Sequence, residues 1–104
     1  MEPTHVSELL FGRKCRLAVA AWVLNHPKDR FFQSEPRGFE NASTSNIRDE
    51  LARLVQLGML EVERPDDGRR IYYVRTTSRL WDVIAAALAA IEAEQGFPLS
   101  TPLS

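Results

Sequence analysis

The sequence contains one cysteine, Cys15, and two histidines, His5 and His26, among its 104 residues. A single thiol excludes an internal disulfide and a cysteine cluster for structural zinc. The chain has no Cys-x-Cys motif and no histidine pair at helical spacing, so we expect no metal site and no cofactor. Cys15 stands in an apolar stretch and is expected to be a small packed side chain, with a disulfide across a dimer as the alternative.

Long apolar runs and a secretory signal are also absent. The first ten residues, MEPTHVSELL, contain no basic segment followed by an apolar run, and the longest apolar run near the C-terminus is too short to cross a bilayer. We therefore expect a cytoplasmic protein without a membrane partner. The chain has 44% hydrophobic and 26% charged residues, which is ordinary for a globular protein, and 104 residues suffice for a single domain, 1–104.

The features of a catalytic site are lacking. There is no glycine-rich phosphate loop, no Ser-His-Asp set and no carboxylate pair that spacing brings together, so we expect a protein that is not an enzyme. The net charge is only −1, which is unfavourable for a nucleic-acid-binding protein. Its distribution is more favourable, because all 13 Lys and Arg residues lie at or before Arg79 and residues 1–79 carry a net charge of +2.

The stretch VSELLFGRKCRLAVAAWVLN, residues 6–25, has a helical pattern that Gly12 interrupts. It predicts a short helix near 5–11 and a longer one from about 13 to 25, which ends before Pro27. The apolar residues of the longer helix are Leu17, Val19, Ala21, Trp22, Val23 and Leu24. Because they nearly surround it, the helix must be covered on more than one side.

The segment 28–41 is predicted to hold a short extended piece at Phe31 and Phe32, and then a short helix from 35 to about 41. Ser34 would cap that helix, and Pro36 is tolerated in its first turn. Gly38 weakens the helix from within, so we expect it to be poorly formed.

The stretch STSNIRDELARLVQLG, residues 43–58, carries the clearest helix signal. Several residues could cap this helix, of which Asn46, with Asp49 three residues later, resembles a capping box, and Gly58 is a natural terminator. A buried stripe of Ile47, Leu51 and Leu54 turns a polar face outward. That outward face consists of Ser45, Asp49, Ala52 and Gln56, flanked by Arg48 and Arg53.

This outward face suits the major groove of DNA, because Arg pairs with guanine, and Ser or Asn pairs with base edges or phosphates. Asp49 would accept a hydrogen bond from cytosine or orient Arg48 or Arg53, although against phosphate it would repel. The alternative is an ordinary solvated helix face.

Residues 59–65 and 69–75 are two predicted strands joined by an Asp-Gly turn, which is a strong hairpin signal. The arginines around this hairpin are Arg64, Arg69, Arg70 and Arg75. Beside a groove-sized helix, such a hairpin can reach the neighbouring DNA backbone or minor groove. The alternative is a small edge sheet whose arginines pair with the nearby acids Glu61, Glu63, Asp66 and Asp67.

The last predicted helix begins at Thr77 or Ser78 and ends near Gln95, and residues 96–104 are expected to form a loose tail. From Leu80 to Ile91 its only charged residue is Asp82, so it has more apolar surface than one core can cover. We expect a homodimer built on this helix, together with the apolar helix of residues 13–25. The residues expected at the interface are Leu80, Ile84, Leu88 and Ile91, which form one stripe, and Trp81 beside it. The alternative is a monomer whose own chain covers the helix.

The stretch TSNIRDELARLVQLGMLEVERPDDGRRIYYVR, residues 44–75, resembles the recognition helix and wing of winged helix-turn-helix regulators of the ArsR and MarR type. The matching features are a helix with Leu51 and Leu54, the LGML that follows it, a first wing strand, a glycine-containing tip and RRIYYVR. GRKCRLAVAAWVLNHPKDRFFQSE is similar to the family's first helix and the approach to its second, so the resemblance covers roughly residues 10–90. SEPRGFENAS departs from the pattern, because Pro36 and Gly38 fall where the first helix of the helix-turn-helix belongs.

The resemblance implies a mainly α fold with a small β-hairpin (α+β): a three-helix core and wing over about 6–76 and a dimerisation helix over about 78–95. It also implies a dimeric transcriptional regulator, with the helix of about 45–57 in the major groove of double-stranded DNA and the wing, 61–75, on adjacent backbone or minor groove. The residues implied in DNA binding are Thr44, Ser45, Asn46, Arg48, Asp49, Arg53, Arg69 and Arg70. The alternative is a winged-helix protein-interaction module, a scaffold or antitoxin-like partner that does not bind DNA. The sequence indicates no operator, small-molecule effector or sign of regulation.

Overall fold

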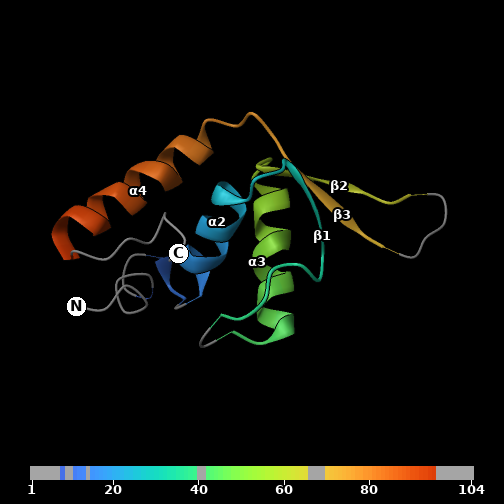
Figure 1. The fold of residues 1–104 in the computed structure, drawn as a ribbon, viewed down its shortest axis with the longest axis horizontal. Coiled ribbons are helices and arrows are strands. Elements are labelled where there is room, and N and C mark those ends of the chain that lie inside the picture. The colour runs from blue at the N-terminus through green and yellow to red at the C-terminus, as the bar shows by residue number, and fades with distance from the viewer. Residues whose placement is uncertain (1–7, 9–10, 14, 40–41, 66–69, 96–104) are drawn as a thin grey trace.

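A computed structural model describes residues 8, 11–13, 15–39, 42–65 and 70–95 of the chain (Figure 1). Over these residues the fold is α+β, with three long helices and a three-stranded antiparallel sheet. The elements in chain order are α2 (Arg16–Asn25), β1 (Arg30–Phe32), α3 (Thr44–Gln56), β2 (Leu60–Glu63), β3 (Tyr72–Arg75) and α4 (Leu80–Gln95). None of the described helices combines the length and the apolarity needed to span a bilayer.

The chain breaks at Gly12, as predicted. Glu8 and Phe11 are helical, and the Gly12 N–H donates to the Glu8 carbonyl oxygen at 2.8 Å. Gly12 has a φ of +82°, a left-handed conformation that ends a helix and that a side chain disfavours. The next helix begins at Arg16 and not at residue 13, and its N-cap is Cys15.

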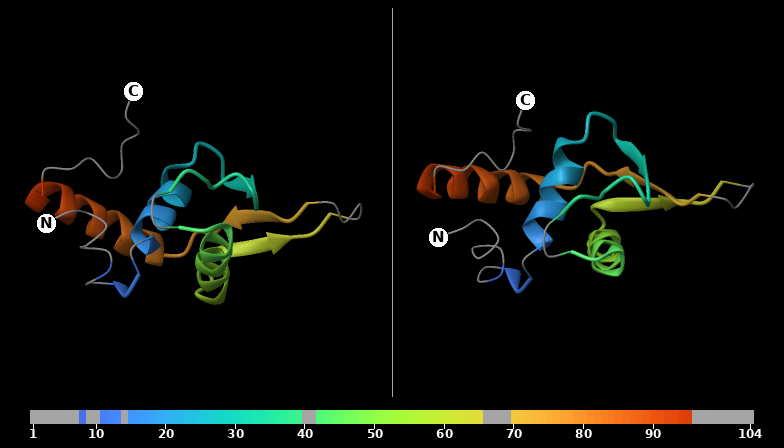
Figure 2. Two further views of the ribbon diagram at one scale, coloured as in Figure 1. Left: turned by 90° about the horizontal axis from the view of Figure 1, so that it is seen from below. Right: turned by 60° about the horizontal axis from the view of Figure 1, so that its bottom comes forward.

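α2 is buried on two sides, which confirms that it is covered on more than one side. Val19 and Val23 pack toward α3 and the sheet, in a cluster with Phe31 and Leu51. Leu17 and Ala21 form a second cluster with Leu88 and Ile91 of α4. Figures 1 and 2 show α2 lying between α4 on one side and α3 with the sheet on the other.

α3 begins one turn earlier than the predicted capping box. Its N-cap is Ser43, whose Oγ accepts a hydrogen bond from the Asn46 N–H at 3.1 Å, so the prediction of Asn46 as the cap is wrong. The end is where the sequence predicts it. The Gly58 N–H donates to Val55 O at 3.0 Å and the Met59 N–H to Leu54 O at 2.9 Å, with Gly58 at a φ of +75°. These two hydrogen bonds end the helix, and the chain continues directly into β2.

The predicted short helix from 35 to about 41 is wrong over its described part. Residues 33–39 form turns and irregular chain, and residues 40 and 41 lie outside the described residues. Pro36 is buried, and Gly38 has a φ of +83°, which an α-helix does not accommodate. α3 is therefore not preceded by a packed helix within residues 33–39.

The sheet has the order β1–β3–β2, with β3 in the centre. Phe31 pairs with Tyr73 across β1 and β3, and Val62 pairs with Tyr73 across β2 and β3. The expected extended piece at Phe31 and Phe32 is therefore confirmed as an edge strand. β2 and β3 form the predicted hairpin in a shorter version, which projects away from the helices (Figure 1). Its expected Asp-Gly tip and the tail of residues 96–104 lie outside the described residues.

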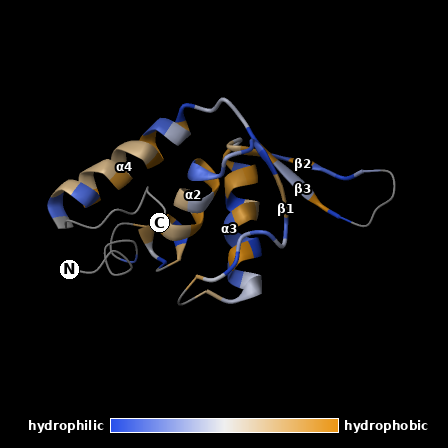
Figure 3. Ribbon diagram, in the orientation of Figure 1, coloured by the Kyte–Doolittle hydropathy of each residue, from blue (hydrophilic) through white to orange (hydrophobic). Residues whose placement is uncertain are grey.

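α4 turns most of the residues predicted for the dimer interface into the chain's own core. Its buried residues are Trp81, Leu88 and Ile91, with Ile84 half-buried, whereas Leu80 is 40% exposed. Trp81 was placed beside the stripe, but its large indole is buried and its Nε1–H donates to Met59 O at 3.0 Å. Figure 3 shows apolar residues along nearly the whole length of α4.

Arg75, which was grouped with the arginines of the hairpin, is a structural residue. Its Nη1 donates to the carbonyl oxygens of Val23 at 2.6 Å and Leu24 at 3.0 Å, at the C-terminal end of α2. Its Nη2 donates to Asp29 Oδ1 at 2.8 Å. A positive charge here binds carbonyl oxygens in the last turn of the helix and complements the helix dipole.

Replacing Arg75 by Ala is expected to lower the free energy of unfolding by about 1–3 kcal/mol, because the α2 carbonyls lose their charged donor. Urea denaturation followed by circular dichroism measures this loss. Arg37→Ala is the control, since Arg37 is exposed in the irregular chain after β1, and an exposed arginine contributes at most about 1 kcal/mol. Equal losses in the two variants would contradict the structural role of Arg75.

Candidate nucleic-acid interface

α3 presents the polar face that its sequence predicts. Ile47, Leu51 and Leu54 point into the core, with exposures of 7%, 0% and 8%. The residues predicted to face outward are all exposed: Ser45, Arg48, Asp49, Ala52, Arg53 and Gln56. Thr44 is exposed as well, and Asn46 is half-buried. The exposure of this face is thus confirmed, while contact with DNA stays a prediction.

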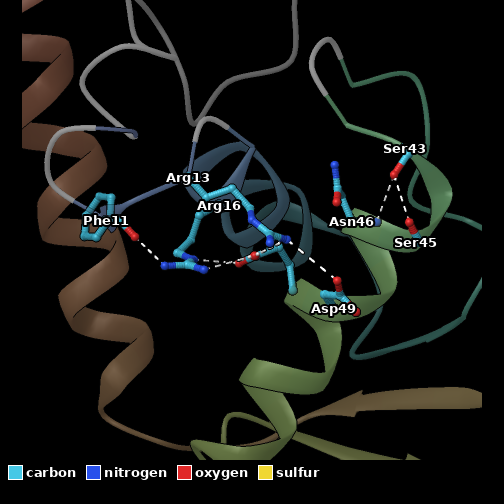
Figure 4. Close-up of polar contacts among 8 residues, drawn as sticks. Phe11, Arg13, Arg16, Ser43, Ser45, Asn46 and Asp49 are labelled. Atoms are coloured by element: carbon cyan, nitrogen blue, oxygen red, sulfur yellow. Dashed lines mark hydrogen bonds and ion pairs between the residues drawn. The ribbon is translucent and has the colours of Figure 1, made fainter.

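The first turn of α3 is a compact polar cluster. Ser43 Oγ lies 3.0 Å from Ser45 Oγ and accepts from the Asn46 N–H at 3.1 Å (Figure 4). These contacts fix the helix N-terminus, where backbone N–H groups without helical partners and the positive end of the helix dipole favour a negatively charged group. The Asn46 side chain extends beside this cluster in Figure 4.

Glu50 is the residue of this site that sequence reasoning missed. It lies on the inward side of α3 and is only 3% exposed. Arg16 of α2 donates from Nε to Glu50 Oε1 at 2.9 Å and from Nη2 to Oε2 at 3.3 Å. The sequence does indicate that Glu50 is buried, because a residue three after Ile47 and four before Leu54 falls on the buried side of the helix. A buried carboxylate requires a cationic partner, and Arg16 of α2 is that partner.

Arg13 joins the same cluster from the segment before α2. Its Nη1 lies 3.3 Å from Glu50 Oε2 and 3.9 Å from Asp49 Oδ2. The predicted partners of Asp49 were Arg48 and Arg53, but the ion pair that the structure gives it is with Arg13. Arg13 therefore brings a positive charge to the polar face of α3 from a different part of the chain (Figure 4).

The hairpin is braced by contacts between arginines and aromatic rings. The Arg30 guanidinium lies 3.7 Å from the Tyr72 ring centroid and pairs with Glu63 at 2.8 Å. The Arg70 guanidinium lies 4.8 Å from the centroid of Phe32. Arg70 is exposed and stays available to an anion, and Arg69 lies outside the described residues. The proposed pairing of hairpin arginines with hairpin acids is wrong for Glu63, whose partner comes from β1.

A cavity of about 250 Å³ adjoins the inner side of this face. It lies between α2, α3 and α4 and is mainly apolar, with Leu17, Leu54 and Ile84 in its wall. Arg16, Glu50 and Arg53 also border it. The Arg16–Glu50 ion pair thus lies between the apolar interior and the exposed face of α3.

Cys15 is 1% exposed, so it cannot reach a second chain without opening the core. Burial raises the pKa of its thiol above the usual value, and the neighbouring Glu50 carboxylate raises it further. A protonated, buried thiol is poorly reactive, which agrees with a packing role. Among the described residues, no group of three or more His, Cys, Asp or Glu side chains is placed to hold a metal ion, and His5 is not among them.

The residues predicted for dimerisation do not form one surface. Trp81, Leu88 and Ile91 are buried within the chain itself, at 6%, 1% and 6% exposure, because α2 and the turn after α3 cover them. Ile84 is half-buried, which leaves Leu80 as the exposed member of the set. Val83, which is not among the residues predicted for the interface, is 58% exposed.

Replacing Glu50 by Gln is expected to lower the free energy of unfolding by about 1.5–3 kcal/mol, since the hydrogen bonds to Arg16 lose their charged acceptor. The matched control is Asp49→Asn on the adjacent residue. The Asp49 side chain is 66% exposed, so its pair with Arg13 contributes at most about 1 kcal/mol. Both values come from urea denaturation, and a control as destabilised as Glu50→Gln would contradict the buried ion pair.

Comparison with known proteins gives no identification. The chain matches no family model, no curated protein and no solved structure.

Proposed function

We propose that this chain is a winged-helix protein that binds double-stranded DNA as a dimeric transcriptional regulator. The observation that carries the proposal is the exposed face of α3, which bears two arginines and a polar first turn beside a projecting hairpin. In this proposal α3 is the recognition helix and β2 with β3 is the wing. The order of helices and strands is compatible with a winged helix, and the chain's resemblance to that family supports the assignment.

The dimensions of α3 suit this role. A helix of 13 residues is about 20 Å long, and the major groove of B-DNA, about 12 Å wide, admits one helix. Arg48 and Arg53 flank the outward face, so they can reach guanine edges or phosphates on either side. Ser45 and Asn46 stand at the N-terminal turn, where base and phosphate contacts are commonly made.

The charge along α3 is more favourable than the near-neutral total of the chain. Glu50 is buried and paired with Arg16, so the exposed carboxylate of this helix is Asp49. Arg48, Arg53 and Arg70 are exposed on α3 and the hairpin. The charges directed at a ligand along α3 are therefore mainly positive.

The dimer in this proposal uses the outward side of α4. Leu80 and Val83 are exposed there, and Ala86 and Ala90 continue the apolar surface one and two turns further on. Leaving a valine-sized side chain in water costs roughly 1.5–3 kcal/mol relative to burying it. Two copies related by a two-fold axis would place their recognition helices about 34–36 Å apart and read a pseudo-palindromic site.

Wild-type protein is expected to retard a random DNA duplex in a gel at low salt, and Arg48→Ala combined with Arg53→Ala should weaken binding at least tenfold. Each lost phosphate or base contact removes a charge-assisted interaction worth about 1–3 kcal/mol. Lys28→Ala combined with Arg79→Ala removes the same charge from exposed residues outside α3 and should bind as the wild type does.

Absence of any retardation at micromolar wild-type protein would overturn DNA binding. It would favour the second candidate, a protein-interaction module. The exposed apolar side chains Leu57 and Val83, at 56% and 58%, favour that candidate because such groups are common in protein interfaces.

Val83→Asp is expected to convert the dimer to a monomer, because a carboxylate in the centre of an apolar interface loses its hydration. Analytical ultracentrifugation measures the mass of each species. Ala85→Asp is the control, on an exposed residue about 200° around the helix from Val83, and it should stay dimeric. A monomeric wild type would show that α4 is covered by its own chain alone.

A further inference from the structure

Arg13 lies between two carboxylates of α3, although it comes from the segment before α2. Its Nη1 is 3.3 Å from Glu50 Oε2 and 3.9 Å from Asp49 Oδ2. The side chain is 36% exposed, which is more than the 24% of Arg16 in the same cluster. Figure 4 shows the Arg13 guanidinium reaching toward Asp49, at the edge of the polar face of α3.

Glu50 does not depend on Arg13 for its counter-charge. Arg16 binds both carboxylate oxygens of Glu50, at 2.9 Å and 3.3 Å. Arg16 is itself fixed by a hydrogen bond to the carbonyl oxygen of Phe11. If Arg13 moved away, the buried carboxylate would still have a fixed cationic partner, so the large cost of an unpaired buried charge would not arise.

The hold of Asp49 on Arg13 is weak. Asp49 has a side chain that is 66% exposed, and its Oδ2 is 3.9 Å from Arg13 Nη1, so solvent around Asp49 screens this ion pair. A phosphate oxygen offers a guanidinium a shorter, charge-assisted hydrogen bond that can be bidentate. A phosphate close to Asp49 would therefore compete with the Asp49 carboxylate for the Arg13 guanidinium. Without Arg13, that phosphate would be repelled by the negative charge of Asp49.

We propose that Arg13 is a phosphate-binding residue of the DNA interface, which exchanges its contact with Asp49 for a DNA phosphate beside the second turn of α3 while it stays beside Glu50. Arg16 meanwhile stays on Glu50 and holds α3 in place. This inference rests on the proposed DNA binding. It adds a cation from outside α3 and the hairpin to the interface, and it explains how Asp49 is tolerated on a face directed at a polyanion.

The test is the salt dependence of binding to a random duplex, measured by fluorescence anisotropy between 50 and 200 mM NaCl. Each phosphate contact contributes about 0.9 to the slope of log K against log salt. Arg13→Ala should therefore lower the magnitude of that slope by about 1. Between 50 and 200 mM NaCl, the factor by which its affinity falls should be about three times smaller than the factor for the wild type. Arg13→Lys keeps the cation and should keep the slope.

Lys28→Ala is the charge-matched control, since Lys28 is an exposed residue beyond the opposite end of α2. It should bind with the wild-type slope. If the wild type binds DNA and Arg13→Ala has the same slope as Lys28→Ala, the role of Arg13 is overturned while the proposed function stands. If the wild type does not bind, both are overturned. Circular dichroism of each variant establishes that it is folded, and Arg13→Gln replaces Arg13→Ala if the latter unfolds.

A double variant separates phosphate binding from simple neutralisation of Asp49. Asp49→Asn removes the negative charge that Arg13 compensates. If Arg13 contacts phosphate, the slope stays about 1 lower in Arg13→Ala with Asp49→Asn than in Asp49→Asn alone. Equal slopes in those two variants would mean that Arg13 only neutralises its neighbour, and they would overturn the proposal.

Discussion

A buried carboxylate joins the N-terminal end of α2 to the second turn of α3, and the orientation of the exposed helix face depends on it. Glu50 is 3% exposed and bound through both oxygens by Arg16. A buried ion pair contributes little net stability compared with an apolar contact, but an incorrect rotation of α3 would leave its charges without partners. The apolar stripe allows some rotation of the helix, whereas the two hydrogen bonds to a guanidinium restrict it. Holding α3 at one rotation is the clearest role of this pair.

α3 needs such an attachment because of what precedes it. Residues 33–39 are irregular, so within that stretch no helix packs against α3 to hold it. The other end is secured by the turn at Gly58, which leads directly into β2, and by the Trp81 indole on the Met59 carbonyl oxygen. The helix is thus fixed at both ends by polar contacts and along its length by Ile47 and Leu51. A helix held in this way has little conformational entropy left to lose on binding.

Local sequence patterns predicted much of the fold, and contacts between distant residues explain where they failed. The spacing of Ile47, Leu51 and Leu54 indicates which side of α3 faces the core, so the prediction of its outward side was accurate. The burial of Glu50 depends on Arg16, a residue in another helix, and periodicity carries no information about that partner. Arg75 was grouped with the hairpin for the same reason, since its acceptors are carbonyl oxygens at the end of α2.

α4 illustrates a different limit. Helical spacing identified the apolar residues of α4 but not what covers them, and Trp81, Leu88 and Ile91, which were predicted for a dimer interface, are buried in the chain's own core. Residues 35–39 failed as a helix because one proline and one left-handed glycine outweigh a weak capping signal. The role of the α3 face is not fixed by either kind of reasoning, because a polar exposed helix has the same periodicity whether it meets DNA, a protein or water.

The central position of β3 has a consequence for the order in which the chain folds. β1 pairs with β3, which follows α3 and β2 in the chain. Phe31 therefore cannot pair with Tyr73 until β3 has left the ribosome. Until then Phe31 has no sheet to cover it, although α2 and α3 already have the residues needed to associate. Contacts between distant residues form slowly, and an unpaired strand edge is prone to aggregation. Nascent chains that stall before β3 therefore expose an aromatic strand that the complete protein buries.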